Sequence, residues 1–393
     1  MKQRHGYIIT MLCAGLLLTL CGCSDDSSDS MQLRTQELRL SLGYPAFRNI
    51  DGITRALPDS FELYNYASSL QPISEIQCYL TYEQEVENQK HQKFISCQFD
   101  HDTTKTATPA HIWTSKVPLY TLNGNSYYLY GFMPKGSVFA SKEKENANSG
   151  AAIEPYGEPA SYAKGAKMTF TGLNTVIAAD LCVIVGVQGY DGTTANIPDM
   201  SSRLGKFNYY PDTDGNYLFL LADHLYAGLK FNMKLDNDYA ALRGITVKTI
   251  KLIPEDGGND VVETVDAVVT IAANNANQNP VSVVFQNPIS GKSPQPAVLY
   301  EGEGKPLSTT AEEFMACVCP ANNTNTKFTL ETTYDVYDHK GNKIRENQKA
   351  KNAISLQYSL EAGKRHIVTI TVKPTYLYVL SDPDLDSPTF VTN

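Results

Sequence analysis

The sequence predicts an all-β protein with two domains. Twenty-four Tyr, twenty Pro and twenty-six Gly accompany many short runs of Val, Ile, Thr and Tyr, which is typical of strands joined by turns. No stretch of the 393 residues shows sustained helical periodicity, and the chain is long enough for two domains of ordinary size. Acidic and basic residues are mixed along the chain and give a net charge of −9, which argues against nucleic acid as a partner.

Residues 1–22 have the pattern of a secretory signal peptide. Two basic residues precede an apolar run that is too short for a comfortable transmembrane span. Leu20-Cys21-Gly22-Cys23 resembles a bacterial lipobox, in which the Cys23 thiol receives diacylglycerol. The alternative is ordinary signal-peptide cleavage with Cys23 unmodified. The next seven residues contain three Asp and no bulky side chain, so we expect a solvated tether.

Residues 23–55 combine this tether with a strand that can be removed. Its residues alternate in the period-two pattern of a strand with one apolar face. Turn-forming residues follow and end at Arg55-Ala56, a bond open to a trypsin-like protease. Cleavage would release a folded strand and expose an apolar groove that needs a replacement. The alternative is an ordinary first strand with a surface linker. The apolar face consists of Leu38, Leu40, Leu42 and Tyr44.

Residues 56–255 are predicted as the first domain. Strand patterns occupy 61–66, 78–82, 127–134, 180–187, 229–235 and 245–253. Asn123-Gly124-Asn125 predicts a hairpin turn, and the polar composition of 141–166 predicts a long solvated loop. Turn formers and charges at 254–260 predict the domain boundary.

Residues 256–393 are predicted as the second domain. Its strand patterns are 261–271, 281–285, 297–300, 328–337 and 366–372. Pro374 is expected to end the pairing of the last of these strands. The tail beyond it still carries strand-forming residues, so we expect a strand that is available to fill a groove. One face of this tail strand consists of Tyr376, Tyr378 and Leu380.

No motif predicts catalysis, a metal or a cofactor. His-Glu-x-x-His, Gly-x-Ser-x-Gly and paired-carboxylate motifs are absent, so we do not expect an enzyme. Asp212, Asp214 and Asn216 match the first ligand positions of a calcium loop, but Tyr217 replaces the Gly of position six, which favours a turn. His224 has no recognisable catalytic neighbour and is expected to be a core or edge histidine.

Five Cys follow residue 55, an odd number at irregular spacing. Cys78 and Cys97 are one pair that could form a disulfide in an exported protein. Cys317 and Cys319 lack the second ligand pair of a zinc site, so we expect buried strand thiols.

The order of these motifs resembles the fimbrillin family of Bacteroidota, the subunits of the type V pilus. The resemblance runs from the lipobox through Thr54-Arg55-Ala56, the strands at 128–134, 224–235 and 245–252, and the Ala362-Gly363-Lys364 turn to the tail. It implies two transthyretin-like β-sandwich domains and export to the cell surface as an outer-membrane lipoprotein. It also implies cleavage by an Arg-specific protease and polymerisation when a neighbour's C-terminal strand fills the vacated groove.

Carried over to this chain, the resemblance implies lipidation at Cys23, cleavage between Arg55 and Ala56, and donation of 374–393 to a neighbour. The implied partners are other fimbrial subunits, the protease, the outer membrane before maturation, and a host or bacterial surface ligand. Pro383 and Pro388 lack a backbone amide donor, so they limit how much of the tail can pair as a continuous donor strand. The alternative function is a surface glycan-binding lipoprotein, although Trp113 is the only Trp and sugar platforms usually need several exposed aromatic residues.

Overall fold

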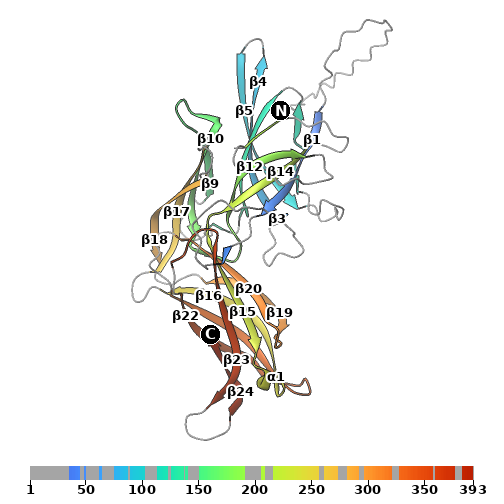
Figure 1. Ribbon diagram of the computed structural model, residues 1–393, viewed down its shortest axis with the longest axis vertical. Helices are drawn as coiled ribbons and strands as arrows, with labels where there is room; N and C mark the ends of the chain where they lie inside the picture. The colour runs from blue at the N-terminus through green and yellow to red at the C-terminus, as the bar shows by residue number, and fades with distance from the viewer. Residues whose placement is uncertain are drawn as a thin grey trace, which may run out of the picture. The chain divides into compact units, whose positions relative to one another are not determined.

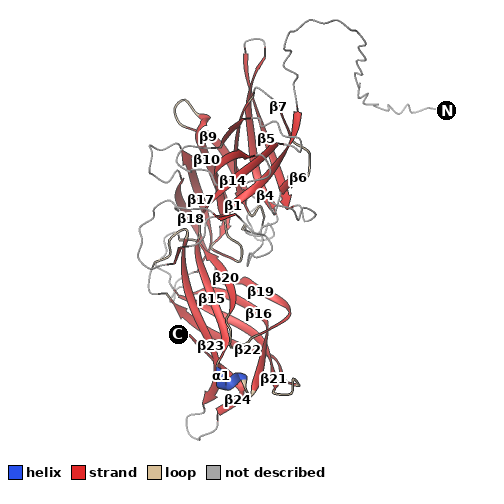
Figure 2. Cartoon of the chain, turned by 45° about the vertical axis from the view of Figure 1, so that its right-hand side comes forward, coloured by secondary structure: helices blue, strands red, loops and turns tan. Residues whose placement is uncertain are grey.

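The computed structural model shows a protein made almost entirely of strands (Figures 1 and 2). Residues 34–393 form one compact unit. The single helix of the described part is α1 (Asn237–Ala240), so the predicted all-β class is confirmed. None of the described helical residues forms a segment long and apolar enough to cross a membrane. The structure describes residues 35–44, 48–49, 62–63, 75–86, 89–101, 113–122, 125–136, 138–139, 150–190, 205–208, 216–255, 261–272, 281–291, 296–320, 327–356, 359–376 and 383–392.

The largest sheet curls until it closes on itself. Its strands pair in the order β12-β14-β1-β6-β5-β4-β8-β13, with β3 and β7 also paired to β1, and β12 pairs with β8 as well. The closed sheet surrounds a core that includes Trp113, Phe99 and Leu129. Its strands are β1 (Thr35–Tyr44), β3 (Glu62–Leu63), β4 (Glu75–Val86), β5 (Gln89–His101), β6 (Trp113–Ser115), β7 (Tyr120–Leu122), β8 (Ser126–Met133), β12 (Cys182–Tyr190), β13 (Lys206–Asn208) and β14 (Asn216–His224).

A four-stranded sheet packs on one side of the closed sheet. Phe170 on its β10 and Phe132 on β8 meet edge to face at 5.1 Å between ring centroids, within a core that both sheets line. The four strands pair in the order β18-β17-β10-β9. They are β9 (Gly150–Tyr156), β10 (Ser161–Asn174), β17 (Val261–Ala272) and β18 (Val281–Gly291).

Two further sheets form a sandwich around a separate core. One sheet has the order β11-β20-β15-β23-β2, with β24 also on β23, and the other has the order β19-β16-β21-β22. The strands of the first are β2 (Arg48–Asn49), β11 (Val176–Ile177), β15 (Ala227–Leu235), β20 (Glu312–Val318), β23 (Lys364–Tyr376) and β24 (Pro383–Thr392). Those of the second are β16 (Arg243–Glu255), β19 (Ala297–Pro306), β21 (Lys327–Asp338) and β22 (Lys343–Ser355).

Alternation of apolar residues identifies the inner face of the sandwich strands correctly. In β15 the predicted inward residues are all buried and the residues between them are half-buried. In β21 the five residues predicted to share one face are likewise buried. They are Leu229, Phe231, Met233 and Leu235 in β15, and Phe328, Leu330, Thr332, Tyr334 and Val336 in β21.

The predicted loop at 141–166 is wrong in its second half. Residues 150–156 and 161–174 form the antiparallel strands β9 and β10. Ala151 and Ile153 pack against the core, which stabilises strands in a segment whose overall composition is polar. The predicted Asn-Gly hairpin is also wrong in its pairing, because β7 pairs with β1 rather than with β8.

The strand pairing crosses the sequence boundary at 254–260 in both directions. β15 and β16 precede that boundary and belong to the sandwich, whereas β17 and β18 follow it and pair beside β10. A cut at residue 255 therefore does not separate the two sets of sheets, and the residues from 256 to 260 lie outside the described part.

Candidate functional site

The candidate site is the place of β1 in the closed sheet. β1 runs parallel to β14, with Leu38 opposite Asn216 and Gly43 opposite Leu221. On its other side β1 is antiparallel to β7, β6 and β3, and the Leu38 amide donates to the Leu119 carbonyl at 2.7 Å. β1 is thus an interior strand, and its loss would leave unpaired backbone groups on both sides.

The apolar face of β1 is part of the core of the closed sheet. Leu38 and Leu40 are 0% exposed, and Leu40 lies directly opposite Trp113, which is also 0% exposed. The backbone of Leu42 pairs with that of Leu220 on β14. Removal of β1 would therefore uncover side chains of this core that are now fully buried, such as Trp113 and Leu220.

The segment that precedes Arg55 contributes to two sheets. After β1, the chain forms β2, in which Arg48 pairs with Lys364 and Asn49 with Arg365 of β23 in parallel register. Cleavage after Arg55 would separate both strands from the rest of the chain. Cys23, Arg55 and Ala56 themselves lie outside the described residues.

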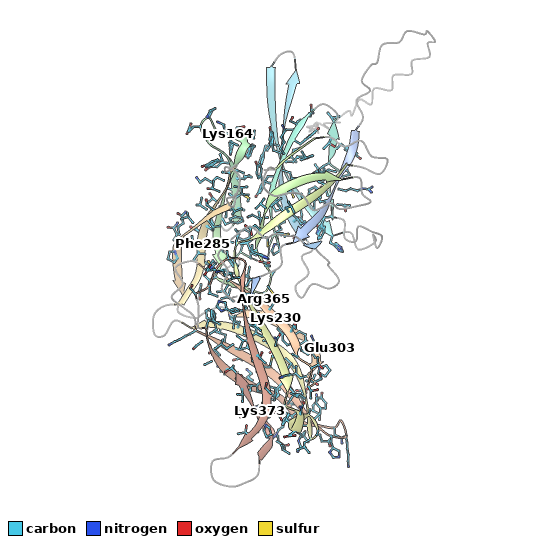
Figure 3. All side chains as sticks on the ribbon, viewed as in Figure 1. Lys164, Lys230, Phe285, Glu303, Arg365 and Lys373 are labelled. Atoms are coloured by element: carbon cyan, nitrogen blue, oxygen red, sulfur yellow. The ribbon has the colours of Figure 1, made fainter. Side chains whose placement is uncertain are left out.

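The C-terminal tail pairs within its own sheet. β24 is antiparallel to β23, and Phe390 is 6% exposed against the Tyr334 ring, with 5.0 Å between centroids. β2 meets β23 at Arg365 and β24 meets it at Lys373, which lie at opposite ends of β23 in Figure 3. The tail is therefore not a free strand here. Tyr378 and Leu380 lie outside the described residues.

Pro374 does not end the pairing as predicted. The ladder shifts register between Lys373 and Thr375 and then continues to Tyr376, which lies opposite Pro383. A proline lacks an amide donor, and the irregularity accommodates that loss without ending the strand. On the β24 side the same shift leaves 385–388, including Pro388, outside the ladder.

A second group of polar side chains lies where β12 and β14 meet. The Nδ1 atom of His224 is 2.6 Å from the Oδ2 atom of Asp180 and 3.5 Å from the Sγ atom of Cys182. All three residues are buried, and Cys182 lies opposite His224 in the strand register. His224 is thus a core histidine, as predicted, but a carboxylate and a thiol accompany it.

The comparisons with known proteins add structural neighbours only. No protein-family model and no curated protein matches the sequence. A candidate cell adhesion protein from Bacteroides fragilis has 11% identity and a TM-score of 0.45, over 91% of this chain and 97% of its own. A second candidate cell adhesion protein, from Bacteroides uniformis, has 11% identity and a TM-score of 0.35, over 93% and 98% of the two chains.

A fimbrial protein from Bacteroides vulgatus has 11% identity and a TM-score of 0.30, over 91% of this chain and 98% of its own. These structural neighbours are fimbrial and cell adhesion proteins of Bacteroides.

The buried thiols have the properties expected of core residues. Burial raises the pKa of Cys97 to about 12, and burial raises the pKa values of Cys182 and Cys317 well above the ordinary value. Neutral thiols are poor nucleophiles, so these side chains are not reactive cysteines in this state. Cys78 and Cys97 face each other in register as thiols rather than as a disulfide.

Sequence analysis missed the neighbours of His224 because they are 42 and 44 residues away along the chain. The one signal that could have found them is the apolar run of β12, which directly follows Asp180-Leu181 and must pair with another buried strand. The spacing of residues in the sequence does not identify that partner strand.

Proposed function

We propose that this protein is a structural subunit of a surface fimbria, exported as a lipoprotein through Cys23 and matured by cleavage after Arg55. The observation that supports the proposal most is the position of β1, an interior strand with two fully buried leucines that ends shortly before Arg55. Removal of a strand that lay only on the protein surface would expose no apolar groove.

The energetics favour replacement of β1 over simple loss. Burying one leucine contributes about 1.5 to 3 kcal/mol, so Leu38 and Leu40 together contribute roughly 3 to 6 kcal/mol before any strand hydrogen bonds are counted. A domain is stable by only about 5 to 15 kcal/mol. The cut subunit would therefore be marginal until another strand occupies the groove, and that strand would join it to a neighbour.

The donor in this proposal is the C-terminal tail of a neighbouring subunit. For donation, β24 must first leave β23 of its own chain. Two side chains outside β23 also hold β24: Arg243 of β16 donates to Asp386 at 2.9 Å, and the Tyr239 hydroxyl of α1 donates to the Leu385 carbonyl at 3.0 Å. These contacts hold the tail before assembly. They would reduce premature pairing with other chains.

Glycan binding as the main function receives no support from the single tryptophan. Trp113 lies inside the closed sheet and is 0% exposed, so it cannot stack on a sugar ring from solution. The exposed aromatic side chains of the described part are Phe94, Tyr120 and Tyr156, which lie on three different strands.

The proposal is tested by cleaving the purified protein with an Arg-specific protease and running it on a gel without boiling. We expect ladders of polymers whose subunits begin at Ala56. Arg55→Ala should abolish both the cleavage and the ladders, whereas the matched variant Arg48→Ala, in the paired strand β2, should leave them unchanged. Complete cleavage after Arg55 that yields only a sharp monomer would contradict the proposal.

A further inference from the structure

The Asp180, Cys182 and His224 side chains do not form a nucleophilic triad. In such a triad the nucleophile bonds one ring nitrogen and the carboxylate bonds the other. Here the carboxylate oxygen and the thiol sulfur both approach the same ring nitrogen, Nδ1. The three ligand atoms lie within 4.8 Å of one another, so one ion could contact all three.

The donor types and separations suit a tetrahedral metal ion. Bonds of about 2.3 Å to sulfur and 2.0 to 2.1 Å to nitrogen place those two ligand atoms about 3.6 Å apart, close to the 3.5 Å between Sγ and Nδ1. The 2.6 Å between Oδ2 and Nδ1 is a hydrogen-bond distance. It must widen by roughly 0.8 Å to reach a tetrahedral separation, which a modest rotation of the carboxylate provides.

The charges of the three ligands also balance the charge of a divalent ion. A carboxylate and a thiolate supply two negative charges, and a neutral imidazole supplies none, so a divalent ion gives a neutral centre that can be buried without an uncompensated charge. The chain neighbours Leu181 and Leu225 are both 0% exposed, so water has little access to the site. Asp223 and Cys317 also lie near enough to Cys182 to influence its thiol. A thiolate and an imidazole select Zn²⁺ over Mg²⁺ or Ca²⁺, which prefer several oxygen ligands.

We propose that Asp180, Cys182 and His224 form a buried three-ligand binding site for a thiophilic divalent cation, with Zn²⁺ as the ion of best fit. On binding, the Cys182 S–H bond is replaced by a metal–sulfur bond and the thiol proton leaves to solvent. His224 coordinates through Nδ1 and keeps its proton on Nε2. The site does not depend on the proposed role in a fimbria.

The position of the site predicts a structural role. Cys182 and His224 lie at facing ends of β12 and β14, and the Leu225 amide donates to the Leu181 carbonyl at 2.9 Å beside them. Directly after His224 the chain leaves the closed sheet and enters β15 of the sandwich. A bound ion would cross-link the two strands at this crossover. Because the ligands are fully buried, we expect the ion to enter during folding and not afterwards.

The test refolds the full chain from guanidinium, under reducing conditions, in the presence of Zn²⁺ alone or of chelator alone. We expect one zinc ion per chain to survive desalting after refolding with Zn²⁺, and a higher Tm than for the chelator-treated protein. Co²⁺ in place of Zn²⁺ should produce a thiolate-to-cobalt charge-transfer absorption band, which reports a metal–sulfur bond directly.

Cys182→Ser keeps the size of the side chain and removes the sulfur, so it should lose the retained zinc and the charge-transfer band. His224→Gln should lose the zinc as well. Cys97→Ala removes another buried thiol of the closed sheet and should retain both signals. The proposal is overturned if folded wild-type protein retains no more zinc than folded Cys182→Ser, or if its cobalt form lacks the charge-transfer band.

Discussion

Truncating Leu40 tests whether β1 carries the stability of the uncut protein. Leu40 is 0% exposed in the core of the closed sheet, and replacing such a leucine by alanine costs about 2 to 5 kcal/mol. This loss is a large part of a typical stability of about 5 to 15 kcal/mol. For a urea m-value of about 3 kcal/mol/M, the unfolding midpoint of Leu40→Ala should fall by roughly 0.7 to 1.7 M.

The assay can follow this core alone. Trp113 is the only tryptophan of the chain and lies directly opposite Leu40, so its fluorescence reports the unfolding of the closed sheet rather than of the sandwich. Val284→Ala is the matched control, because Val284 is a strand residue that is 60% exposed, and its truncation should cost less than about 1 kcal/mol.

Two outcomes would refute the reasoning. If Leu40→Ala unfolds at the same urea concentration as the Val284→Ala control, β1 does not stabilise the closed sheet. After cleavage at Arg55 and removal of the released segment, the Trp113 emission should shift toward the wavelength of exposed tryptophan. An unchanged emission would mean that the core closes without β1 and that no groove forms.

Three other predictions follow from the chain. Cys23→Ala should abolish labelling by radioactive palmitate and retention in the outer membrane, and unchanged labelling would disprove lipidation at this residue. Deleting 376–393 should leave secretion and cleavage intact but prevent donation to a neighbour; fibres of the truncated protein in electron micrographs would exclude the tail as donor. Burial raises the pKa of Asp335, but hydrogen bonds from Lys343, from the Asn347 amide and from Lys248 together lower it by more, so the net shift is downward. The resulting stabilisation is present above the ordinary value of 3.8 and is lost as the pH falls below it, so the Tm of wild type should fall more steeply than that of Asp335→Asn on acidification, and parallel curves would count against it.

Local pattern was sufficient to predict which residues of a strand face a core. The alternation in β15 and β21 identifies their buried residues, because successive side chains of a strand point to opposite faces whatever the strand pairs with. The same reasoning failed for β9, where packing of Ile153 against the core outweighs a polar local composition.

Sequence alone determined that this chain is an all-β protein with an alternating strand near its N-terminus, and it predicts an export signal at residues 1–22 and cleavage after Arg55. Only the tertiary structure decided that β1 lies between β14 and β6, that the tail pairs with β23, and that Asp180 and Cys182 meet His224. The physical reason is that strand periodicity is a property of neighbouring residues. Strand pairing instead joins backbones far apart in the chain, and the burial of whole sheets selects the partner.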